Sequence, residues 1–290
     1  MKTLLILLIT TLGVFSKPVI APTNYPLAYF TERLAGNFAE ILYEIPADVD
    51  PAFWKPTDAQ ISAIQKADLI ILNGATYGKW IITTSLPDDK IVDTSLAFAD
   101  SFLESGNTIT HSHGKGGTHS HGGTAFTTWM DLNQARQQAT AIKDALVATF
   151  PDHADSINEA YPKLTKDLMD LHEEMKKSAA SLSTKTFLAS HPIYEYFSRA
   201  YGLKIHTLVW EPEMELTKKA LADLEKLHKK HPAAKTFIWE GNPSPGHIPT
   251  LAKLGLKSII ITPAFSKPGA DMDFLQAMRN NLEALKSTGE

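Results

Sequence analysis

Hydrophobic positions along the chain follow two periods, one typical of helices and one typical of buried strands. Apolar residues recur every three or four positions over 25–36, which predicts a helix that ends at Gly36. The segment 68–74 reads Asp-Leu-Ile-Ile-Leu-Asn-Gly, and its apolar run bounded by Asn-Gly predicts a buried strand. By the same criteria, further helices are predicted at 57–66, 131–150, 155–182, 192–201, 214–231, 244–254 and 272–286. Further strands are predicted at 40–45, 90–93, 186–190, 203–208, 236–239 and 258–262.

The order of these elements predicts the fold class. Helices alternate with buried strands, which favours an α/β fold with mainly parallel sheets. The alternation occurs on both sides of the long helix at 155–182, so we expect two lobes, each a small mainly parallel sheet flanked by helices, joined by this long backbone helix. The predicted boundaries are an N-terminal lobe at 17–153, a connecting long helix at 154–183 and a C-terminal lobe at 184–290. Ligands in such folds bind at the carboxyl ends of strands, so the cleft between the lobes is the expected site.

The N-terminus has the layout of an export signal. Lys2 precedes an apolar stretch over 4–14, and the small residues Val14 and Ser16 suit a cleavage site. The apolar stretch is too short to span a membrane as a helix. We therefore expect residues 1–16 to be a secretory signal peptide and the rest of the chain to be exported.

Composition narrows the chemistry. The formal net charge of −4 gives no basic surface for nucleic acid or for an anionic membrane. The chain contains no cysteine, so we expect neither a thiolate metal site nor a lipid anchor on cysteine. A metal ion would then be held by histidine, carboxylate or water, which suits Zn²⁺ or Mn²⁺ better than Cu⁺. The hydrolase motifs HExxH and GxSxG are absent, so we expect no enzyme.

The segment ITHSHGKGGTHSHGG, residues 109–123, carries the clearest chemistry. Its four histidines are His111, His113, His119 and His121. Imidazole is the commonest protein ligand of transition metals, and side chains two positions apart share one face of an extended chain. The many glycines favour a mobile surface loop over a core strand or helix. We therefore predict a His-rich loop that binds metal, and the alternative is a solvated polar loop.

Several segments resemble the metal-specific solute-binding proteins of ABC importers, the ZnuA/TroA-like zinc and manganese receptors. They are NYPLAYFTERLAG from Asn24, KADLIILNG from Lys66, WMD from Trp129 and HPIYEYFSRAYGL from His191, in this order around the long helix. A His-rich loop before the tryptophan motif is typical of the zinc branch. The resemblance implies an exported receptor, in the periplasm of a Gram-negative bacterium, that binds Zn²⁺, with Mn²⁺ the less favoured cation. Such a receptor is expected to be a monomer that delivers its metal ion to an ABC permease.

The resemblance also implies a cleft site of three histidines and a carboxylate, which this chain matches only in part. His191 stands at one histidine position, whereas Ala52, Thr127 and Thr262 stand at the other three ligand positions. A zinc site normally needs three or four protein ligands. We therefore predict that Glu240, directly after a strand, joins His191 in the cleft. Further candidates are the His-rich loop closing over the cleft and the carboxylates Glu211, Asp271 and Asp273. Two alternatives stay open: the His-rich loop is the principal metal site and His191 a remnant, or the protein no longer binds metal as the family does.

Two functions are compatible with these features, and a third is disfavoured. The favoured one is an extracytoplasmic zinc-binding protein, the substrate-binding component of an ABC metal importer, which captures Zn²⁺ through the His-rich loop and the interlobe cleft. The alternative is a divergent zinc scavenger or chaperone without its own permease. A secreted hydrolase is the third. The predicted metal ligands are His111, His113, His119, His121, His191 and Glu240.

Overall fold

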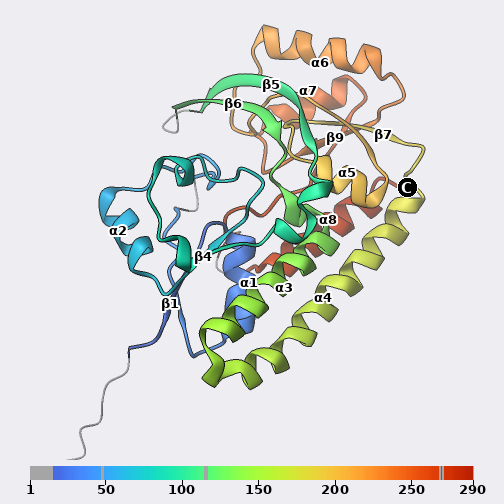
Figure 1. The fold of residues 1–290 in the computed structure, drawn as a ribbon. Helices are drawn as coiled ribbons and strands as arrows, with labels where there is room; N and C mark the ends of the chain where they lie inside the picture. The colour runs from blue at the N-terminus through green and yellow to red at the C-terminus, as the bar shows by residue number, and fades with distance from the viewer. Residues whose placement is uncertain (1–15, 47–48, 114–116, 268, 270, 290) are drawn as a thin grey trace, which may run out of the picture.

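Two four-stranded parallel sheets form two lobes, and a long helix runs between them (Figure 1). The computed structural model describes residues 16–46, 49–113, 117–267, 269 and 271–289, and for 106–113 and 117–122 it describes the backbone alone. The expected fold class, two α/β lobes joined by a backbone helix, is confirmed. None of the helices in the described part of the chain is long and apolar enough to cross a membrane.

The N lobe holds the first sheet, in the strand order β2-β1-β3-β4, with every neighbouring pair parallel. Its strands are β1 (Val19–Pro22), β2 (Glu40–Ile41), β3 (Leu69–Leu72) and β4 (Ile91–Asp93). Its helices are α1 (Tyr25–Ala35), α2 (Asp58–Lys66) and α3 (Leu132–Thr149). Short 3₁₀ helices lie at Ile81–Thr83, Asp88–Lys90, Leu96–Ser101, Thr128–Met130 and Pro151–His153.

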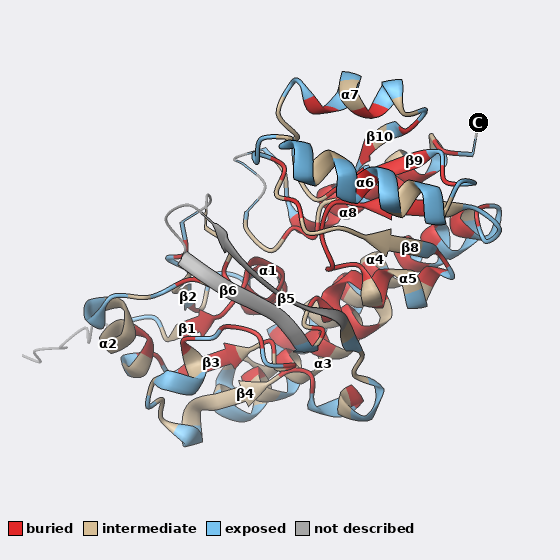
Figure 2. Ribbon diagram, turned by 90° about the horizontal axis from the view of Figure 1, so that it is seen from above, coloured by how far each residue is buried: buried red, intermediate tan, exposed pale blue. Residues whose placement is uncertain are grey.

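The C lobe holds the second sheet, in the strand order β10-β9-β7-β8, again with parallel neighbours. Its strands are β7 (Thr186–Ala189), β8 (Lys204–Thr207), β9 (Thr236–Trp239) and β10 (Lys257–Ile260). Its helices are α5 (Glu195–Tyr201), α6 (Lys218–Lys230), α7 (His247–Lys253) and α8 (Phe274–Lys286). Figure 2 shows the outer face of α6 exposed and β9 buried beneath it. The four residues of β9 are all buried, as expected for a central strand of a covered parallel sheet.

The long helix α4 (Ala154–Ala180) joins the two halves of the chain. It packs against α1, α3 and α8, and the four helices lie side by side in Figure 1. Its apolar positions keep helical spacing and form one fully buried stripe, which includes Leu164, Leu168 and Met175. One hydrophobic core therefore extends from the N lobe through these helices into the C lobe. Each lobe adds a smaller core of its own on the other face of its sheet.

Local capping residues set where several helices begin. The side chain of Asn24 accepts a hydrogen bond from the backbone of Leu27, and Asp131 caps α3 in the same way. The helix predicted to begin at 214 begins only at Lys218, because Thr217 is its N-cap and its side chain accepts from Ala220. Such shifts of a few residues arise where a polar side chain competes for the free N–H groups of the first turn.

The segment predicted as a His-rich loop at 109–123 is instead mostly a β-hairpin. Strand β5 (Glu104–His113) pairs antiparallel with β6 (Gly117–Thr124), apart from both parallel sheets. The prediction of a loop is therefore wrong for these backbone positions. The glycines disfavour a core strand, but they do not prevent backbone pairing in a two-stranded ribbon, and the alternating HSH triplets have the period of a strand.

Trp129 ties the two lobes together and gives a direct test of this packing. Its ring is fully buried, and its indole N–H donates to the backbone oxygen of Pro263, 2.6 Å away. We expect Trp129→Ala to lower the free energy of unfolding by about 3–5 kcal/mol, since it leaves a large cavity. Urea unfolding followed by circular dichroism measures this loss. The exposed Ile82 offers a control, since Ile82→Ala should change the stability little. Equal unfolding midpoints for the two variants would contradict the packing described.

Candidate metal centre

Three potential metal ligands converge in the C lobe, and we call them the His191 cluster. It consists of His191, Glu211 and Glu240, each of which offers a ligand atom within 4.8 Å of the others. The Nδ1 atom of His191 lies 3.0 Å from Oε1 of Glu211 and 3.5 Å from Oε1 of Glu240. The side chains are 5%, 18% and 9% exposed, respectively. Buried carboxylates this close together and next to an imidazole form a suitable ligand set for a divalent cation.

Parallel strand order explains why residues so far apart in the chain meet. His191 follows β7, Glu211 follows β8 and Glu240 follows β9, and β7 lies between the other two strands. The ladder continues past the strand ends, because Ser190 donates to the Ile238 oxygen at 2.9 Å and accepts from the Trp210 N–H at 2.7 Å. The carboxyl ends of parallel strands share one edge of the sheet, so all three ligands arrive at that edge.

Each glutamate of the cluster is held by the tryptophan that precedes it. Trp210 and Trp239 are buried in the small core of the C lobe, with ring centroids 6.2 Å apart. Successive side chains of an extended segment point to opposite sides. Burial of each tryptophan therefore directs the following Glu211 or Glu240 away from the core and towards His191.

The electrostatics of the cluster favour a cation. Burial alone would lower the pKa of His191, but the negative charges of Glu240 and Glu211 outweigh it and raise this pKa to about 9. Burial raises the pKa of Glu240 well above its ordinary value, and repulsion from Glu211 adds to the effect. The ionised form of Glu240 is thus disfavoured by burial and by the nearby negative charge of Glu211. A divalent cation between the two carboxylates would offset this free-energy cost.

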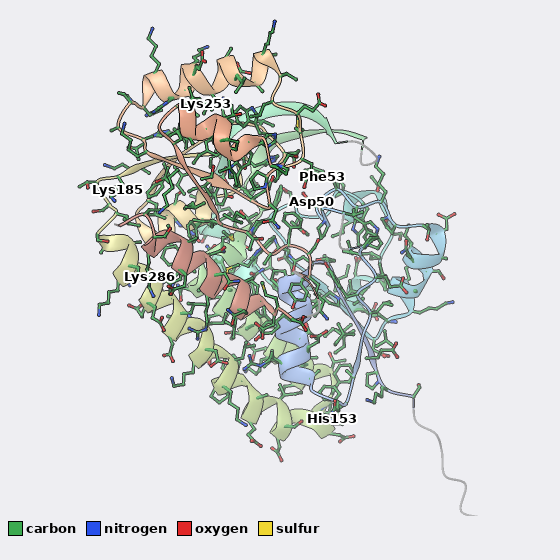
Figure 3. All side chains as sticks on the ribbon, turned by 180° about the vertical axis from the view of Figure 1, so that it is seen from behind. Asp50, Phe53, His153, Lys185, Lys253 and Lys286 are labelled. Atoms are coloured by element: carbon green, nitrogen blue, oxygen red, sulfur yellow. The ribbon has the colours of Figure 1, made fainter. Side chains whose placement is uncertain are left out.

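Among the described residues of the N lobe, Asp50 is a carboxylate whose negative charge acts on this cluster, at His191 and Glu240. Burial raises the pKa of Asp50 to about 6, while the Ala52 N–H and His191 act in the opposite direction and Glu211 adds to the rise. One oxygen of Asp50 accepts the Ala52 N–H at 2.8 Å. Figure 3 shows Asp50 and Phe53 where the N lobe meets the C lobe. Asp50 is not among the ligands predicted from the sequence, although it lies two residues before Ala52, one of the positions where the family resemblance implied a ligand.

The structure brings together two of the predicted ligands and adds a third from the further candidates. His191 and Glu240 meet, and Glu211 joins them. The side chains of His111, His113, His119 and His121 lie outside the described residues. Their backbone register pairs position 111 with 119 and position 109 with 121. The two candidate aspartates lie elsewhere in other roles, since Asp273 caps α8 by accepting from Gln276 at 2.8 Å and Asp271 is exposed.

The three positions without a metal-binding side chain have structural contacts instead. The hydroxyl of Thr127 donates to the Ile193 oxygen at 2.7 Å, and that of Thr262 accepts from the Ala264 N–H at 3.1 Å. Ala52 is buried, and its N–H donates to Asp50. Position 127 is one at which the family pattern would place a ligand. Here Thr127 links the N lobe to the segment just after His191 instead.

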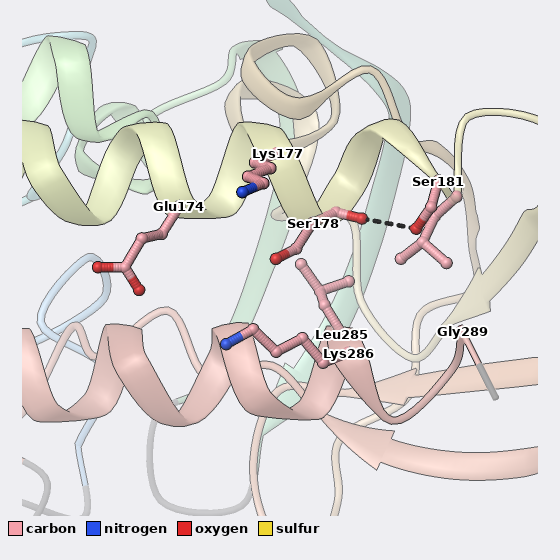
Figure 4. A pocket seen from close by; sticks show the side chains of 8 residues that line it. Glu174, Lys177, Ser178, Ser181, Leu285, Lys286 and Gly289 are labelled. Atoms are coloured by element: carbon pink, nitrogen blue, oxygen red, sulfur yellow. Dashed lines mark hydrogen bonds between the residues drawn. The ribbon is translucent and has the colours of Figure 1, made fainter.

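A separate groove lies at the opposite end of the C-lobe sheet, between the ends of α4 and α8. Its volume is about 480 Å³, and Figure 4 shows Lys177 and Lys286 on its two helices with Glu174 nearby. The chain passes from α4 into the start of β7 here, whereas the His191 cluster follows the end of β7. The groove is therefore no part of the metal centre.

Comparison with known proteins places the chain in a family. The model of the ZnuA family, "Zinc-uptake complex component A periplasmic", matches residues 20–288. The zinc-binding lipoprotein AdcA of Streptococcus pneumoniae strain R6 is 27% identical over 280 residues, which is 93% of this chain and 55% of AdcA. The high-affinity zinc uptake system protein ZnuA of Bacillus subtilis is 25% identical over 279 residues, which is 93% of this chain and 86% of that protein. The chain thus spans about half the length of AdcA.

Solved structures share the fold. The metal-dependent lipoprotein YcdH of Bacillus subtilis has a TM-score of 0.77 at 23% identity, over 93% of this chain and 98% of that one. Zn(II)-bound AdcA of Streptococcus pneumoniae also has a TM-score of 0.77, at 24% identity over 94% of this chain and 58% of AdcA. The match of the family model over nearly the whole described chain, together with this shared fold, shows that the chain belongs to the ZnuA family of periplasmic zinc-uptake components.

Proposed function

We propose that this chain is the extracytoplasmic zinc-binding component of an ABC metal importer. The observation that carries the proposal is the buried His191 cluster at the carboxyl ends of three C-lobe strands. Zinc is the cargo in this account. One imidazole nitrogen and carboxylate oxygens from Glu211 and Glu240 supply the three protein ligands that a zinc site with an open position uses. The relatives are named for zinc binding and zinc uptake, which supports this choice of cation.

The chemistry of capture is an exchange of protons for the cation. In the cation-free cluster, the carboxylates and the imidazole compete for protons because they are buried together. A divalent cation displaces these protons and compensates the buried negative charge. A buried site with few water contacts retains the cation until the surroundings of the ligands change. We infer that release occurs when the chain meets its permease.

The His-rich hairpin is proposed as a second metal-binding segment that first captures the cation. Its register pairs His111 with His119, and His113 and His121 stand two positions further along their strands. On an antiparallel ladder, such positions belong to the same alternate set. Imidazoles at these positions would bind zinc when neutral.

Replacing the four hairpin histidines with alanine is expected to reduce zinc binding without abolishing it. The variant should lose the hairpin's share of the bound zinc and keep one cation in the His191 cluster. Equilibrium dialysis followed by metal analysis measures the number of ions per chain. A matched control replaces Ser112 and Ser120, which occupy the other alternate positions of the same strands, and should bind as the wild type does. Unchanged stoichiometry in the histidine variant would exclude the hairpin site, and loss of all binding would exclude the His191 cluster.

Partner and location follow from the family. The family is described as periplasmic and as part of an uptake complex, and we propose delivery by a monomeric chain to an ABC permease rather than catalysis. The finer location, the periplasm of a Gram-negative bacterium, stays a prediction, since the relatives compared come from Streptococcus and Bacillus. The predicted lack of a lipid anchor is not supported by relatives that are named lipoproteins. Stimulation of a permease's ATPase activity by the zinc-loaded chain would distinguish a receptor from a scavenger.

A further inference from the structure

We propose that Asp50 supplies the N-lobe ligand of the cation held by the His191 cluster, in place of an imidazole at position 52, so that one bound cation connects the two lobes. This inference rests on the proposed function, because it adds a ligand to the same site. The cluster itself comes entirely from the C lobe. Without a ligand from the N lobe, the cation would contact only one of the two lobes that enclose it.

Hydrogen bonds fix the Asp50 segment against the C lobe. The hydroxyl of Ser266, in the segment after β10, donates to the Val49 oxygen at 3.1 Å. The Phe53 N–H donates to the Asp50 oxygen at 3.0 Å, which closes a turn over 50–53. The Phe53 ring packs edge-on against Phe126, with centroids 6.3 Å apart, and the next residue, Thr127, is bonded to Ile193. The turn is therefore held next to the segment that carries His191.

The side chain of Asp50 is oriented for coordination. Its Oδ1 atom accepts the Ala52 N–H, which fixes the direction of the carboxylate. Within the described part of the chain, the other oxygen accepts no hydrogen bond. Asp50 interacts electrostatically with both His191 and Glu211 across the boundary between the lobes. Position 52 itself is alanine and its methyl group cannot coordinate, so the nearest group that can is the carboxylate two residues earlier.

A buried hydroxyl beside Asp50 gives an independent indication of a ligand. Tyr77 is only 4% exposed, and among the described residues its hydroxyl has no hydrogen-bond partner. The charge of Asp50 acts on this hydroxyl, which places the two groups near each other. Buried hydroxyls without a partner are rare in folded proteins, and a bound water molecule or ion is a usual explanation. The N lobe thus contributes a carboxylate and a hydrogen-bonding group at the same place.

Asp50→Asn tests this ligand in the full chain, in the background that lacks the four hairpin histidines. Asparagine keeps the oxygen that accepts the Ala52 N–H and removes the charge. We expect zinc affinity, measured by competition with a chelator, to fall at least about 10-fold, since even residues that only support a zinc ligand contribute about 10–100-fold. In hydrogen–deuterium exchange, zinc should slow exchange of the backbone amides of Ala52 and Phe53 in the parent chain but not in the variant. The matched control Asp58→Asn, an exposed carboxylate of the same lobe, should behave as the parent does.

The outcomes separate the two proposals. Unchanged affinity and unchanged zinc-dependent protection in Asp50→Asn, with binding lost in His191→Ala, would overturn the role of Asp50 and leave the proposed function standing. Unchanged binding in His191→Ala would overturn the proposed function itself. A further measurement distinguishes the ligand role of Asp50 from a purely structural one. The cation-free Asp50→Asn chain should unfold at the parent's urea concentration or above, since one of three neighbouring buried carboxylates is gone. A lower midpoint would count against the inference.

Discussion

Replacing His191 with alanine is expected to lower the zinc affinity of the cluster by more than about 100-fold, since even residues that only support a zinc ligand contribute 10–100-fold. His191 is the sole nitrogen donor among the three ligands, and it lies within 3.5 Å of both glutamates. Its removal leaves the site with carboxylates alone, and it takes away one of the three C-lobe ligands. The measurement is calorimetric zinc titration of chains without hairpin histidines.

A control for this variant comes from a histidine of the same lobe outside the cluster. His231 stands at the end of α6, where its ring stacks on His206 with centroids 3.6 Å apart. His231→Ala should bind zinc as the parent does. The account fails if His191→Ala and His231→Ala bind zinc equally well.

Zinc affinity of the cluster is expected to rise steeply with pH between about 6.5 and 9. The raised pKa of His191, about 9, means that the cation-free imidazole is protonated at neutral pH. Zinc binds only the deprotonated ring, so binding releases this proton below pH 9 and acid weakens it. One released proton changes the affinity about tenfold per pH unit. Protons from Glu240, whose pKa is also raised by burial, would add to this slope.

Calorimetry in buffers with different heats of ionisation counts these protons. At pH 7.5, at least about one proton should leave per zinc bound to the cluster. Zinc bound at the hairpin is expected to release fewer protons at that pH, since the reference pKa of an imidazole is about 6.5. The wild-type chain, which keeps the hairpin histidines, should therefore show two classes of zinc sites, one whose affinity depends strongly on pH and one whose affinity depends weakly on it. An affinity for the cluster that stays flat from pH 7 to pH 9 would contradict the ligand role of His191.

The fold could be predicted because its signals are local. Helical and strand periods alternate along the sequence, and the buried stripe of α4 is visible from its apolar spacing alone. The hairpin was missed because glycine content was given more weight than the alternation of the HSH triplets. Glycine opposes a core strand, but it does not prevent two strands from pairing apart from a core.

The metal centre could be predicted only in part because its members meet through tertiary structure. The family resemblance pointed to His191, and the position directly after a predicted strand pointed to Glu240. Glu211 and Glu240 each follow a tryptophan, and this repeated Trp-Glu dipeptide is a signal that favours Glu211 as a ligand alongside Glu240. Asp50 belongs to the other lobe, and nothing in its local sequence sets its distance from residue 191. That relation depends on how the shared core orients the two sheets.

The central claim is that zinc binds where His191, Glu211 and Glu240 meet, and anomalous diffraction from crystals of the zinc-loaded chain tests it most directly. The account predicts a zinc peak about 2.0–2.2 Å from a ring nitrogen of His191 and from carboxylate oxygens of Glu211 and Glu240, the usual distances for these ligands. Zinc peaks found only at the hairpin, with none at the His191 cluster, would contradict it.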